Sequence, residues 1–300
     1  MRAPVQILTT TAQIERPRLA VFADLVKARL TLLVLLTTLV GFYLGAERPI
    51  GYALMIHTVL GMALLAGGGA ALNQLLEREQ DALMPRTRNR PLPSGRLQPE
   101  TVLVFGTVAS MAGLAYLALA VNLLTAALGA ITLVSYLFIY TPLKRVTWLN
   151  TLVGAVPGAL PPLMGWTAAR GELNLEGWAL FALLAFWQLP HFFAIAWLYR
   201  DEYARAGFKM LPQVDPDGRR TARQSVVYTV VLLVVSACPF VLKLAGPVYL
   251  VSALVLGGAF AACAIQFARQ LTEAKARQMF FASILYLPLL LAVLTLDKGK

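Results

Sequence analysis

A group of polar residues interrupts an otherwise apolar stretch of this chain, and its members recur every four residues. The group comprises Asn73, Glu77 and Asp81, which we call the oxygen triad. On an α-helix, residues four apart lie on one face, so these side chains can converge on one point. Mg²⁺ binds through one or two carboxylates together with phosphate oxygens of a substrate. The spacing therefore predicts a divalent-cation site that a phosphorylated substrate completes.

Arginines follow the oxygen triad closely. Arg86, Arg88, Arg90 and Arg96 lie within the segment 85–96. Guanidinium groups match phosphate oxygens in bidentate geometry, so a basic loop beside metal ligands predicts a site for the diphosphate of a lipid. Two simpler interpretations stay open: the acids form a solvated helix end paired with these arginines, and the arginines only orient the chain in a membrane.

Two further polar segments are predicted to face the same site. Tyr140 and Lys144 are four residues apart, so both can point in one direction, with Lys144 towards phosphate. In the polar segment 200–221, Asp201 and Glu202 are expected to face the oxygen triad if the bundle closes into a ring. Cationic side chains of that segment would add to the phosphate site: Arg200, Arg205 and Lys209.

His191 indicates a second substrate. It follows Pro190 inside an aromatic-rich apolar stretch that includes Trp187 and Phe192. Ionisable side chains inside a membrane are functional candidates, and imidazole is a common axial ligand of haem iron. Packing in the core is the alternative. His57 lies near the far end of its apolar segment from the oxygen triad and is a weaker candidate.

The composition requires membrane helices to position these residues. Of the 300 residues, 58% are hydrophobic and only 14% are charged, and the mean hydropathy is +0.68. A soluble domain carries about 25% charged residues, so this is a polytopic membrane protein. A net charge of +11 does not indicate nucleic-acid binding, because the basic residues lie in short loops between apolar runs.

Neither the cysteines nor the N-terminal segment changes this class. Cys238 and Cys263 lie in apolar segments and form no motif, so we expect neither a disulfide nor a zinc site. Residues 1–25 lack the apolar core and cleavage site of a signal peptide.

The apolar runs predict nine transmembrane helices. The run from Thr101 to Leu143 contains no charged residue. As one helix it would be about 65 Å long, twice the roughly 30 Å of the hydrocarbon layer, so we expect it to fold back at Asn122. The predicted spans are 30–47, 52–73, 101–121, 123–140, 148–169, 177–199, 222–242, 245–267 and 278–296.

The charges of the loops orient this all-α bundle. With a cytoplasmic N-terminus, 21 of the 26 Lys and Arg residues fall on the inside and five on the outside, as the positive-inside rule requires. We therefore expect a cytoplasmic N-terminal segment (1–29) followed by a nine-helix domain (30–296). The long polar loops, 74–100 and 200–221, then share the cytoplasmic face of a cell's inner membrane.

Several motifs resemble the UbiA superfamily of intramembrane prenyltransferases. The general resemblance rests on Asn73-xxx-Glu77-xxx-Asp81 and Tyr140-xxx-Lys144. A closer resemblance to the haem-modifying branch rests on the strings DALMPRTRNRPLP (81–93), YTPLKRVTWLN (140–150), GALPPLMGW (158–166), PHF (190–192) and YRDEYARAG (199–207). It covers roughly residues 24–296. Many members carry an Asp-xxx-Asp second motif, whereas here Asp201 is followed by Arg205, which puts a second fully ligated Mg²⁺ in doubt.

The resemblance implies a UbiA-type bundle and a Mg²⁺-dependent transfer reaction. A farnesyl group would pass from farnesyl diphosphate to a vinyl group of haem B, with addition of water, giving haem O and diphosphate; a haem A synthase is the expected protein partner. The residues expected to act in catalysis are Asn73, Glu77, Asp81, Lys144 and Asp201, and those expected to bind substrates are Arg86, Arg90, Tyr140, Arg145, His191, Arg200 and Tyr203.

Two other functions compete with this one. The first is prenyl transfer to an aromatic or quinone precursor, which has no need of a haem ligand such as His191. The second is transport of an anionic lipid or metabolite. Transporters place their key charges near the middle of the membrane, whereas the charges of this chain gather at one face.

Overall fold

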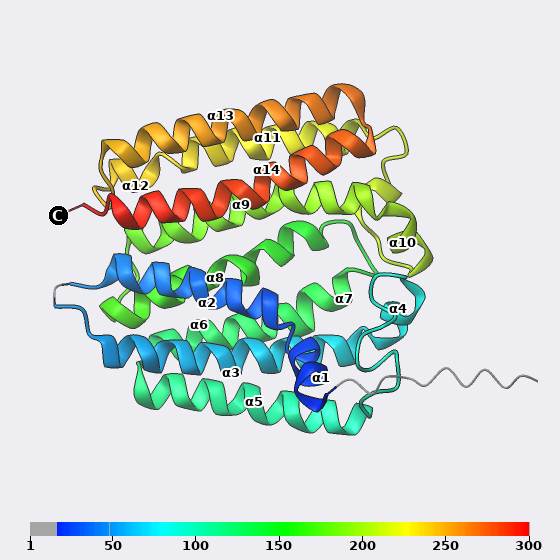
Figure 1. Ribbon diagram of the computed structural model, residues 1–300, viewed down its shortest axis with the longest axis horizontal. Coiled ribbons are helices and arrows are strands. Elements are labelled where there is room, and N and C mark those ends of the chain that lie inside the picture. The colour runs from blue at the N-terminus through cyan, green and yellow to red at the C-terminus, as the bar shows by residue number, and fades with distance from the viewer. Residues whose placement is uncertain (1–16, 48, 300) are drawn as a thin grey trace, which may run out of the picture.

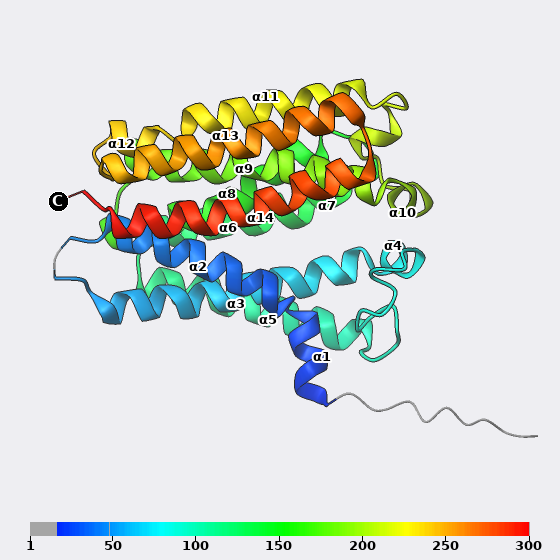
Figure 2. The ribbon, with the colours of Figure 1, turned by 45° about the horizontal axis from the view of Figure 1, so that its top comes forward.

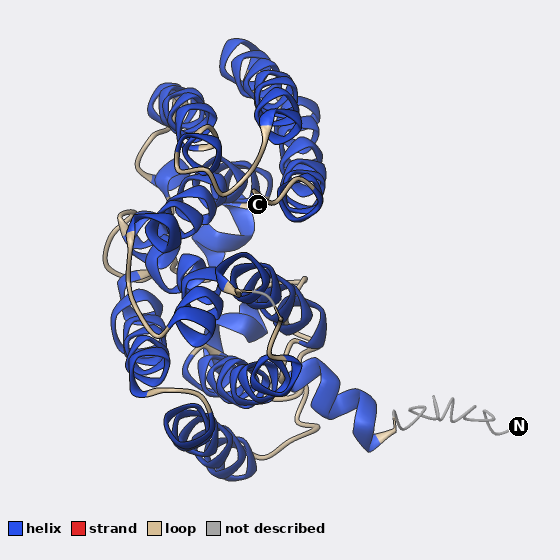
Figure 3. Ribbon diagram, turned by 90° about the vertical axis from the view of Figure 1, so that its left-hand side faces the viewer, coloured by secondary structure: helices blue, strands red, loops and turns tan. Residues whose placement is uncertain are grey.

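The computed structural model of the protein describes residues 17–47 and 49–299. Within these ranges the regular structure is helical, and the long helices run side by side (Figure 1), as the end-on view in Figure 3 also shows. The long helices are α2 (Ala28–Gly45), α3 (Tyr52–Leu76), α5 (Pro99–Ala120), α6 (Leu123–Val134), α8 (Asn150–Arg170), α9 (Leu175–Leu198), α11 (Arg219–Val235), α13 (Pro247–Gln270) and α14 (Glu273–Leu296).

Shorter helical segments lie before, between and at the ends of these helices. The helix α6 continues through a π-helical segment, η1 (Ser135–Tyr140), into α7 (Thr141–Leu143). The remaining short elements are α1 (Arg18–Leu25), α4 (Arg78–Leu83), α10 (Arg200–Arg205), η2 (Leu211–Gln213) and α12 (Cys238–Val241).

The predicted all-helical membrane bundle is confirmed. By length and composition, eight helical segments in the described part of the chain can cross a membrane. They match eight of the nine predicted spans, and the ninth, 148–169, corresponds to α8, whose 21 residues include three internal prolines. α8 packs against both α2 and α9. α1 and the C-terminal end of the chain lie at opposite ends of the bundle (Figure 1), as an odd number of crossings requires.

Local signals in the sequence explain where several helices begin. The predicted turn at Asn122 is confirmed: its Oδ1 accepts a hydrogen bond from Thr125 N (2.8 Å) at the start of α6. Asn174 caps α9 in the same manner, and Thr272 caps α14. Capping side chains satisfy backbone N–H groups that the first turn of a helix leaves free.

Small residues let α2 and α8 approach closely. A Cβ atom added to Gly165 of α8 would lie 1.9 Å from the carbonyl oxygen of Thr38, and one added to Gly41 of α2 would lie 1.9 Å from that of Pro162. Helices in membranes pack through such small residues because lipid supplies no hydrophobic force between them. Outer faces of the bundle instead carry exposed large apolar side chains, such as Leu119 and Leu285.

The two long polar loops lie at the same end of the bundle. Figures 1 and 2 both show α4 and α10 together at the end opposite the C-terminus. The predicted common face of 74–100 and 200–221 is therefore the face to which α1 also belongs. Four basic residues used to orient the chain lie outside the described residues: Arg2, Arg16, Arg48 and Lys300.

The close contact of α2 with α8 makes a direct prediction. Replacing Gly165 with Ala should lower the free energy of unfolding by about 1–3 kcal/mol, because the new methyl group has no room beside the Thr38 carbonyl. Thermal unfolding in detergent measures this change. Gly258→Ala is the matched control, since nothing lies within 4 Å of its Cβ position. Equal stability of the two variants would show that the helices are not in close contact at Gly165.

Candidate active site

The oxygen triad lies where the second long helix leaves the bundle. Asn73 belongs to α3, Glu77 lies between α3 and α4, and Asp81 belongs to α4. The backbone kinks at Glu77, yet Glu77 N donates to Asn73 O (3.0 Å) and Asp81 N to Glu77 O (2.8 Å). The four-residue hydrogen-bond pattern of a helix therefore continues through the kink. All three residues are buried, with exposed fractions of 0%, 4% and 1%.

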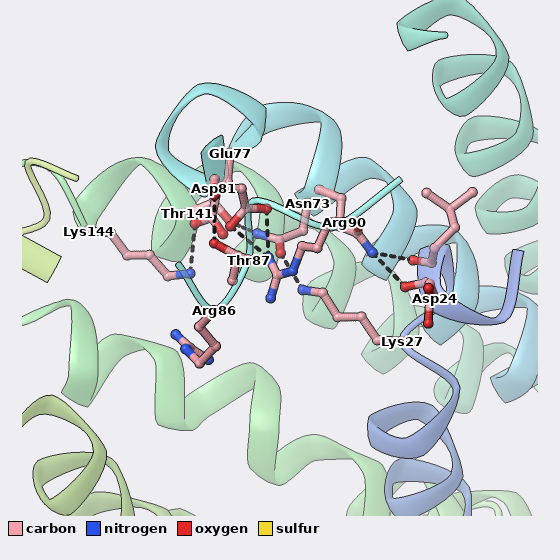
Figure 4. Close-up of polar contacts among 12 residues, drawn as sticks. Asp24, Lys27, Asn73, Glu77, Asp81, Arg86, Thr87, Arg90, Thr141 and Lys144 are labelled. Carbon is pink, nitrogen blue, oxygen red and sulfur yellow. Dashed lines mark hydrogen bonds and ion pairs between the residues drawn. The ribbon is translucent and has the colours of Figure 1, made fainter. Parts of the chain in front are cut away.

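A cation approaches each of the two carboxylates of the triad (Figure 4). Lys144 Nζ lies 2.7 Å from Glu77 Oε1. Arg90 Nη1 lies 2.8 Å and 2.6 Å from the two carboxylate oxygens of Asp81. A buried carboxylate is costly unless it is paired and hydrogen-bonded, so these two cations explain how the acids stay inside the protein.

The third cation, Lys27, contacts the amide of the triad. Its Nζ donates to Asn73 Oδ1 (2.7 Å). Asn73 Nδ2 donates to Thr141 Oγ1 (3.0 Å), and the Thr141 hydroxyl donates to the carbonyl oxygen of Tyr136 (2.8 Å). A hydroxyl has one hydrogen to give, so Thr141 can only accept from Asn73. These hydrogen bonds fix the orientation of the Asn73 amide, so that its oxygen points towards Lys27. This oxygen is the atom that can bind a metal.

The position of Lys27 is set by residues around the turn between α1 and α2. Gln74 of α3 donates to the carbonyl oxygens of Asp24 (2.9 Å) and Leu25 (2.7 Å) at the end of α1. Thr31 donates to Val26 O (2.7 Å). Lys27 itself adopts a left-handed conformation with φ 49°, which is uncommon for residues other than glycine. The fold therefore holds the Lys27 ammonium group against the triad.

Burial and neighbouring charges have opposite effects on the pKa values of Glu77 and Lys144. Burial raises the pKa of the Glu77 carboxyl, but the charges of Lys144 and Lys27 outweigh it and hold that pKa below its usual value. Burial lowers the pKa of Lys144, but Glu77 outweighs it and raises the pKa above its usual value. Burial, together with the charge of Arg90, lowers the pKa of Lys27 to about 7. Lys144 and Glu77 thus stay ionised together.

The predicted pair Tyr140 and Lys144 does share one site. Lys144 Nζ lies 4.5 Å from the centre of the Tyr140 ring. Tyr140 stacks on Tyr136, with ring centres 6.0 Å apart. Both tyrosines belong to η1, and π-helical turns of this kind are frequent at functional sites. The wider π-helical turn places the rings of Tyr136 and Tyr140 in the cavity lining beside the triad.

Arg86 and Tyr203 also face this site. Arg86 Nη2 donates to the Tyr203 hydroxyl (3.2 Å), and its guanidinium group lies over the rings of Tyr199 (5.0 Å) and Tyr203 (5.8 Å). Within the described residues Arg86 forms no ion pair. Its guanidinium is held by aromatic contacts, which leaves its charge available to an anion.

A cavity of about 400 Å³ joins these groups to the interior of the bundle. The oxygen triad, Lys27, Arg86, Arg90, Lys144 and Tyr203 line its polar part. Apolar side chains such as Val34, Met62 and Leu65 line its wall, and His191 lies deeper, about 10 Å from the end of α9. A charged mouth and an apolar interior suit a ligand with an anionic head and a hydrocarbon tail.

His191 is held in one orientation. Its Nδ1 lies 2.7 Å from Ser283 Oγ, and the Ser283 hydroxyl donates to the carbonyl oxygen of Phe280 (2.5 Å). Ser283 therefore accepts from Nδ1–H, which leaves a lone pair on Nε2. The ring stacks between Trp187 and Phe280, at 5.1 Å and 5.0 Å between centres. A hydrogen bond from the second ring nitrogen is typical of histidines that bind metals.

Two predicted substrate-binding residues lie away from this cavity. Arg145 donates to the carbonyl oxygen of Leu76 (3.1 Å) and lines a separate surface pocket. Arg200 lies over the Trp197 ring (5.2 Å) and reaches Glu273 (3.5 Å). The expectation that these arginines face the triad is corrected, because each is engaged with the end of a helix outside the cavity. Arg88 and Arg96 do not line the cavity either.

Asp201 is likewise not brought to the triad. Its side chain is exposed, and it is absent from the cavity lining. Tyr203, two residues later on α10, does line the cavity. Two residues correspond to about 200° of rotation on a helix, so α10 cannot direct both side chains inwards. Asp201 therefore does not face the triad, and its role as a ligand of a second Mg²⁺ stays a prediction.

The oxygen triad fits Mg²⁺ by its donors. Two carboxylates and one amide oxygen are hard ligands, buried on a wall of the cavity. Within residues 17–47 and 49–299, no group of three His, Cys, Asp or Glu side chains could hold a metal. Protein ligands alone would thus leave the coordination sphere of Mg²⁺ incomplete, and phosphate oxygens of a ligand would complete it.

Lys27 is one residue of the cavity that was not predicted from the sequence. Its only signal in the sequence is a positive charge directly before the first apolar run. Gln188, an amide within the sixth apolar run, was missed as well, although a lone polar residue three positions before His191 was visible. Contacts between segments far apart in the chain, such as Lys27 with Asn73, leave no trace in local spacing.

Comparisons with known proteins give the family of the sequence and relatives of the fold. The sequence matches the UbiA prenyltransferase family over residues 34–285. A protoheme IX farnesyltransferase from Solibacter usitatus is 48% identical over 286 residues, covering 92% of this chain and 98% of that protein. The fold is similar to that of a digeranylgeranylglyceryl phosphate synthase in membranes, with a TM-score of 0.79 at 15% identity, covering 93% of this chain and 98% of the other.

A second solved structure is that of a UbiA homologue from Archaeoglobus fulgidus bound to GPP and Mg²⁺. Its TM-score is 0.64 at 16% identity, and the match covers 92% of this chain and 99% of that chain. At this level of identity the likeness concerns the fold.

The Lys144–Glu77 pair makes a prediction about stability. Lys144→Met leaves the Glu77 carboxylate buried without its main partner, so the free energy of unfolding should fall by about 3–5 kcal/mol. Adding Glu77→Gln should restore part of this loss, since the buried charge is then gone. Unfolding in detergent without substrates measures both variants.

Arg219→Met is the control for this pair. Arg219 and its partner Asp217 are exposed at 87% and 61% of their side chains, so the change should be below about 1 kcal/mol. Equal losses in the single and double variants would mean that Lys144 does not stabilise the protein through Glu77.

Proposed function

The chain belongs to the UbiA prenyltransferase family, and we propose that it transfers a farnesyl group from farnesyl diphosphate to a vinyl group of haem B, with addition of water, giving haem O and diphosphate. One observation carries the proposal. The oxygen triad and its cations line the polar part of a cavity, and the apolar part of the same cavity extends to His191. The protoheme IX farnesyltransferase from Solibacter usitatus, 48% identical, supports the same reaction.

The polar end of the cavity would hold the diphosphate. Asn73, Glu77 and Asp81 would hold Mg²⁺, which when bound neutralises charge on the leaving diphosphate. In the structure, Lys27 contacts Asn73 and Arg90 contacts Asp81. When Mg²⁺ and a phosphate group bind, these two cations could leave the triad. The oxygens of the triad would then hold the metal, and the ammonium group of Lys27 and the guanidinium group of Arg90 would turn to the phosphate.

The apolar wall would hold the farnesyl chain and exclude water from it. Charge develops on C1 as the C–O bond to diphosphate lengthens, and water near C1 would yield farnesol. Tyr136 and Tyr140 present stacked rings beside Lys144. The faces of aromatic rings attract a cation, so these residues are placed to favour the allylic cation without reacting with it.

The deep end of the cavity would hold haem B. The lone pair on His191 Nε2, fixed by the bond from Nδ1 to Ser283, is the group that would bind the iron. The flat rings of Trp187 and Phe280 around the imidazole restrict its rotation. An aromatic or quinone acceptor would make no use of this histidine, which favours haem as the acceptor.

The membrane setting follows from the loops. We place the protein in the plasma membrane, with the mouth of the cavity on the cytoplasmic face, because α4 and α10 belong to the two long basic loops and lie at one end. Haem O formed there would be the substrate of a haem A synthase, which we propose as the partner.

The purified protein in lipid nanodiscs tests the reaction. Incubation with farnesyl diphosphate, Mg²⁺ and haem B should release diphosphate and form haem O, detected by mass spectrometry. Release of diphosphate without a haem product would indicate another acceptor. No release at all would favour transport.

The role of Asp81 gives the next prediction. Asp81→Asn keeps the shape of the side chain and removes its charge, so turnover should fall by about 10²-fold or more while haem binding is kept. Turnover is measured as haem O formed, and binding by absorbance titration. Asp217→Asn is the control, because Asp217 is an exposed carboxylate in a loop, with 61% of its side chain exposed. Unchanged turnover in Asp81→Asn would remove this residue from the reaction.

The role of His191 gives a spectroscopic prediction. His191→Ala should abolish the shift of the haem Soret band that binding to the wild-type protein produces, because the iron loses its axial ligand. His57→Ala is the matched control: His57 bonds to Tyr116 (2.7 Å) near the start of α3, at the opposite end of that helix from the triad. Identical haem spectra of the wild type and His191→Ala would show that His191 does not bind the iron and only packs in the core.

A further inference from the structure

Gln188 is a polar side chain that the proposed reaction has not yet used. It lies on α9 three residues before His191, so both share one face of the helix, and both line the cavity. It is 5% exposed and lies about 15 Å from the end of α9. A buried amide at this depth requires a partner for each of its polar atoms.

The amide of Gln188 can be oriented from its contacts. Its Nε2 donates to the carbonyl oxygen of Leu184 (3.0 Å) and lies 3.5 Å from that of Ala155. Carbonyl oxygens only accept, so the nitrogen must face them and Oε1 must face away. Within the described residues Oε1 accepts no hydrogen bond. It is a free acceptor inside the apolar part of the protein.

Gly158 of α8 makes room for this oxygen. A Cβ atom added at Gly158 would lie 2.0 Å from Gln188 Oε1, and Gly158 also lines the cavity. The carbonyl of Gly158 lacks its usual helical donors. In a helix it would accept from the residue three or four positions later, and those are Pro161 and Pro162, which have no N–H.

In the part of the chain that the structure describes, Gln188 Oε1 thus has no donor and lies against Gly158, whose carbonyl lacks its usual donors. Both residues line the cavity, so one water molecule between them would supply both missing hydrogens. The other polar side chains of the cavity interior are less suited. The hydroxyls of Thr37 and Thr132 already donate to carbonyl oxygens of their own helices, Val34 O (2.9 Å) and Leu128 O (2.8 Å).

We propose that Gln188 Oε1 and the Gly158 carbonyl hold the water that completes haem O, which makes Gln188 a positioning residue that acts through this water. The proposal rests on the proposed function. The vinyl group forms a C–C bond to C1 of the farnesyl group, and the C1–O bond breaks with its electron pair going to diphosphate. The vinyl carbon next to the porphyrin is then a cation.

The water donates both O–H groups to Gln188 and Gly158, so its oxygen lone pair faces the cavity. It forms the C–O bond to this second cation, and its extra proton passes to the released diphosphate, the strongest base that the reaction brings into the cavity. The farnesyl cation is consumed when the C–C bond forms, so the water held beside His191 meets the porphyrin cation that follows.

Gln188→Met tests the proposal, since Met keeps the length of the side chain and has no acceptor of comparable strength. Without the held water, the cation loses a proton from the adjacent carbon and gives an alkene, a farnesylated haem lighter than haem O by one water. The ratio of haem O to this alkene should fall at least about tenfold, while diphosphate release changes little. Gln188→Glu should retain haem O, because a buried, neutral acid can donate to the Leu184 carbonyl and accept with its other oxygen.

Two further variants complete the test. Gly158→Ala should also favour the alkene with Gln188 intact, because its methyl group displaces Oε1. Thr132→Val should leave the product ratio unchanged. An unchanged ratio in both Gln188→Met and Gly158→Ala, or a parallel loss of both products, would overturn the proposal. Absence of any farnesylated haem with the wild-type protein would instead overturn the proposed function.

Discussion

The structure depends on balancing two carboxylates that are buried at the end of a membrane bundle. Glu77 and Asp81 are at most 4% exposed, and a carboxylate so far from water must find a positive partner or take up a proton. Lys144 and Arg90 supply these partners. They arrive from the loop after α7 and the loop after α4, so charge balance at one point ties together segments that the chain separates widely.

This balance also explains how the site can accept a charged lipid. The oxygens and the cations already compensate one another, so a bound Mg²⁺ and diphosphate add a second matched pair of charges. The two carboxylates of the triad, Lys144 and Arg90 can each exchange one opposite charge for another at small net cost, because none of these four charges is left unpaired. Lys27 is the most easily exchanged of the cations, since its contact in the triad is the neutral amide of Asn73 and its pKa is lowered to about 7 by burial and by Arg90.

Much of the fold and part of the site could be predicted from the sequence. The lengths of the apolar runs located the helices, and the length of the uncharged run from Thr101 to Leu143 required a turn at Asn122. Both features could be predicted because they depend on local composition. The four-residue spacing of the triad survived the kink at Glu77. Lys27 could not be found, because its position depends on Gln74 holding the end of α1. Asp201 was misplaced because the rotation of the short helix α10 is set by packing at Tyr203.

The most direct test of the account is a crystal structure with Mn²⁺ in place of Mg²⁺ and a non-hydrolysable analogue of farnesyl diphosphate. Anomalous scattering should place one Mn²⁺ within about 2.2 Å of oxygens of the triad and of the diphosphate. Lys27 and Arg90 should then contact phosphate oxygens. A map with no Mn²⁺ peak at the triad, and with the pairs to Lys27, Lys144 and Arg90 unchanged beside a bound analogue, would contradict the account.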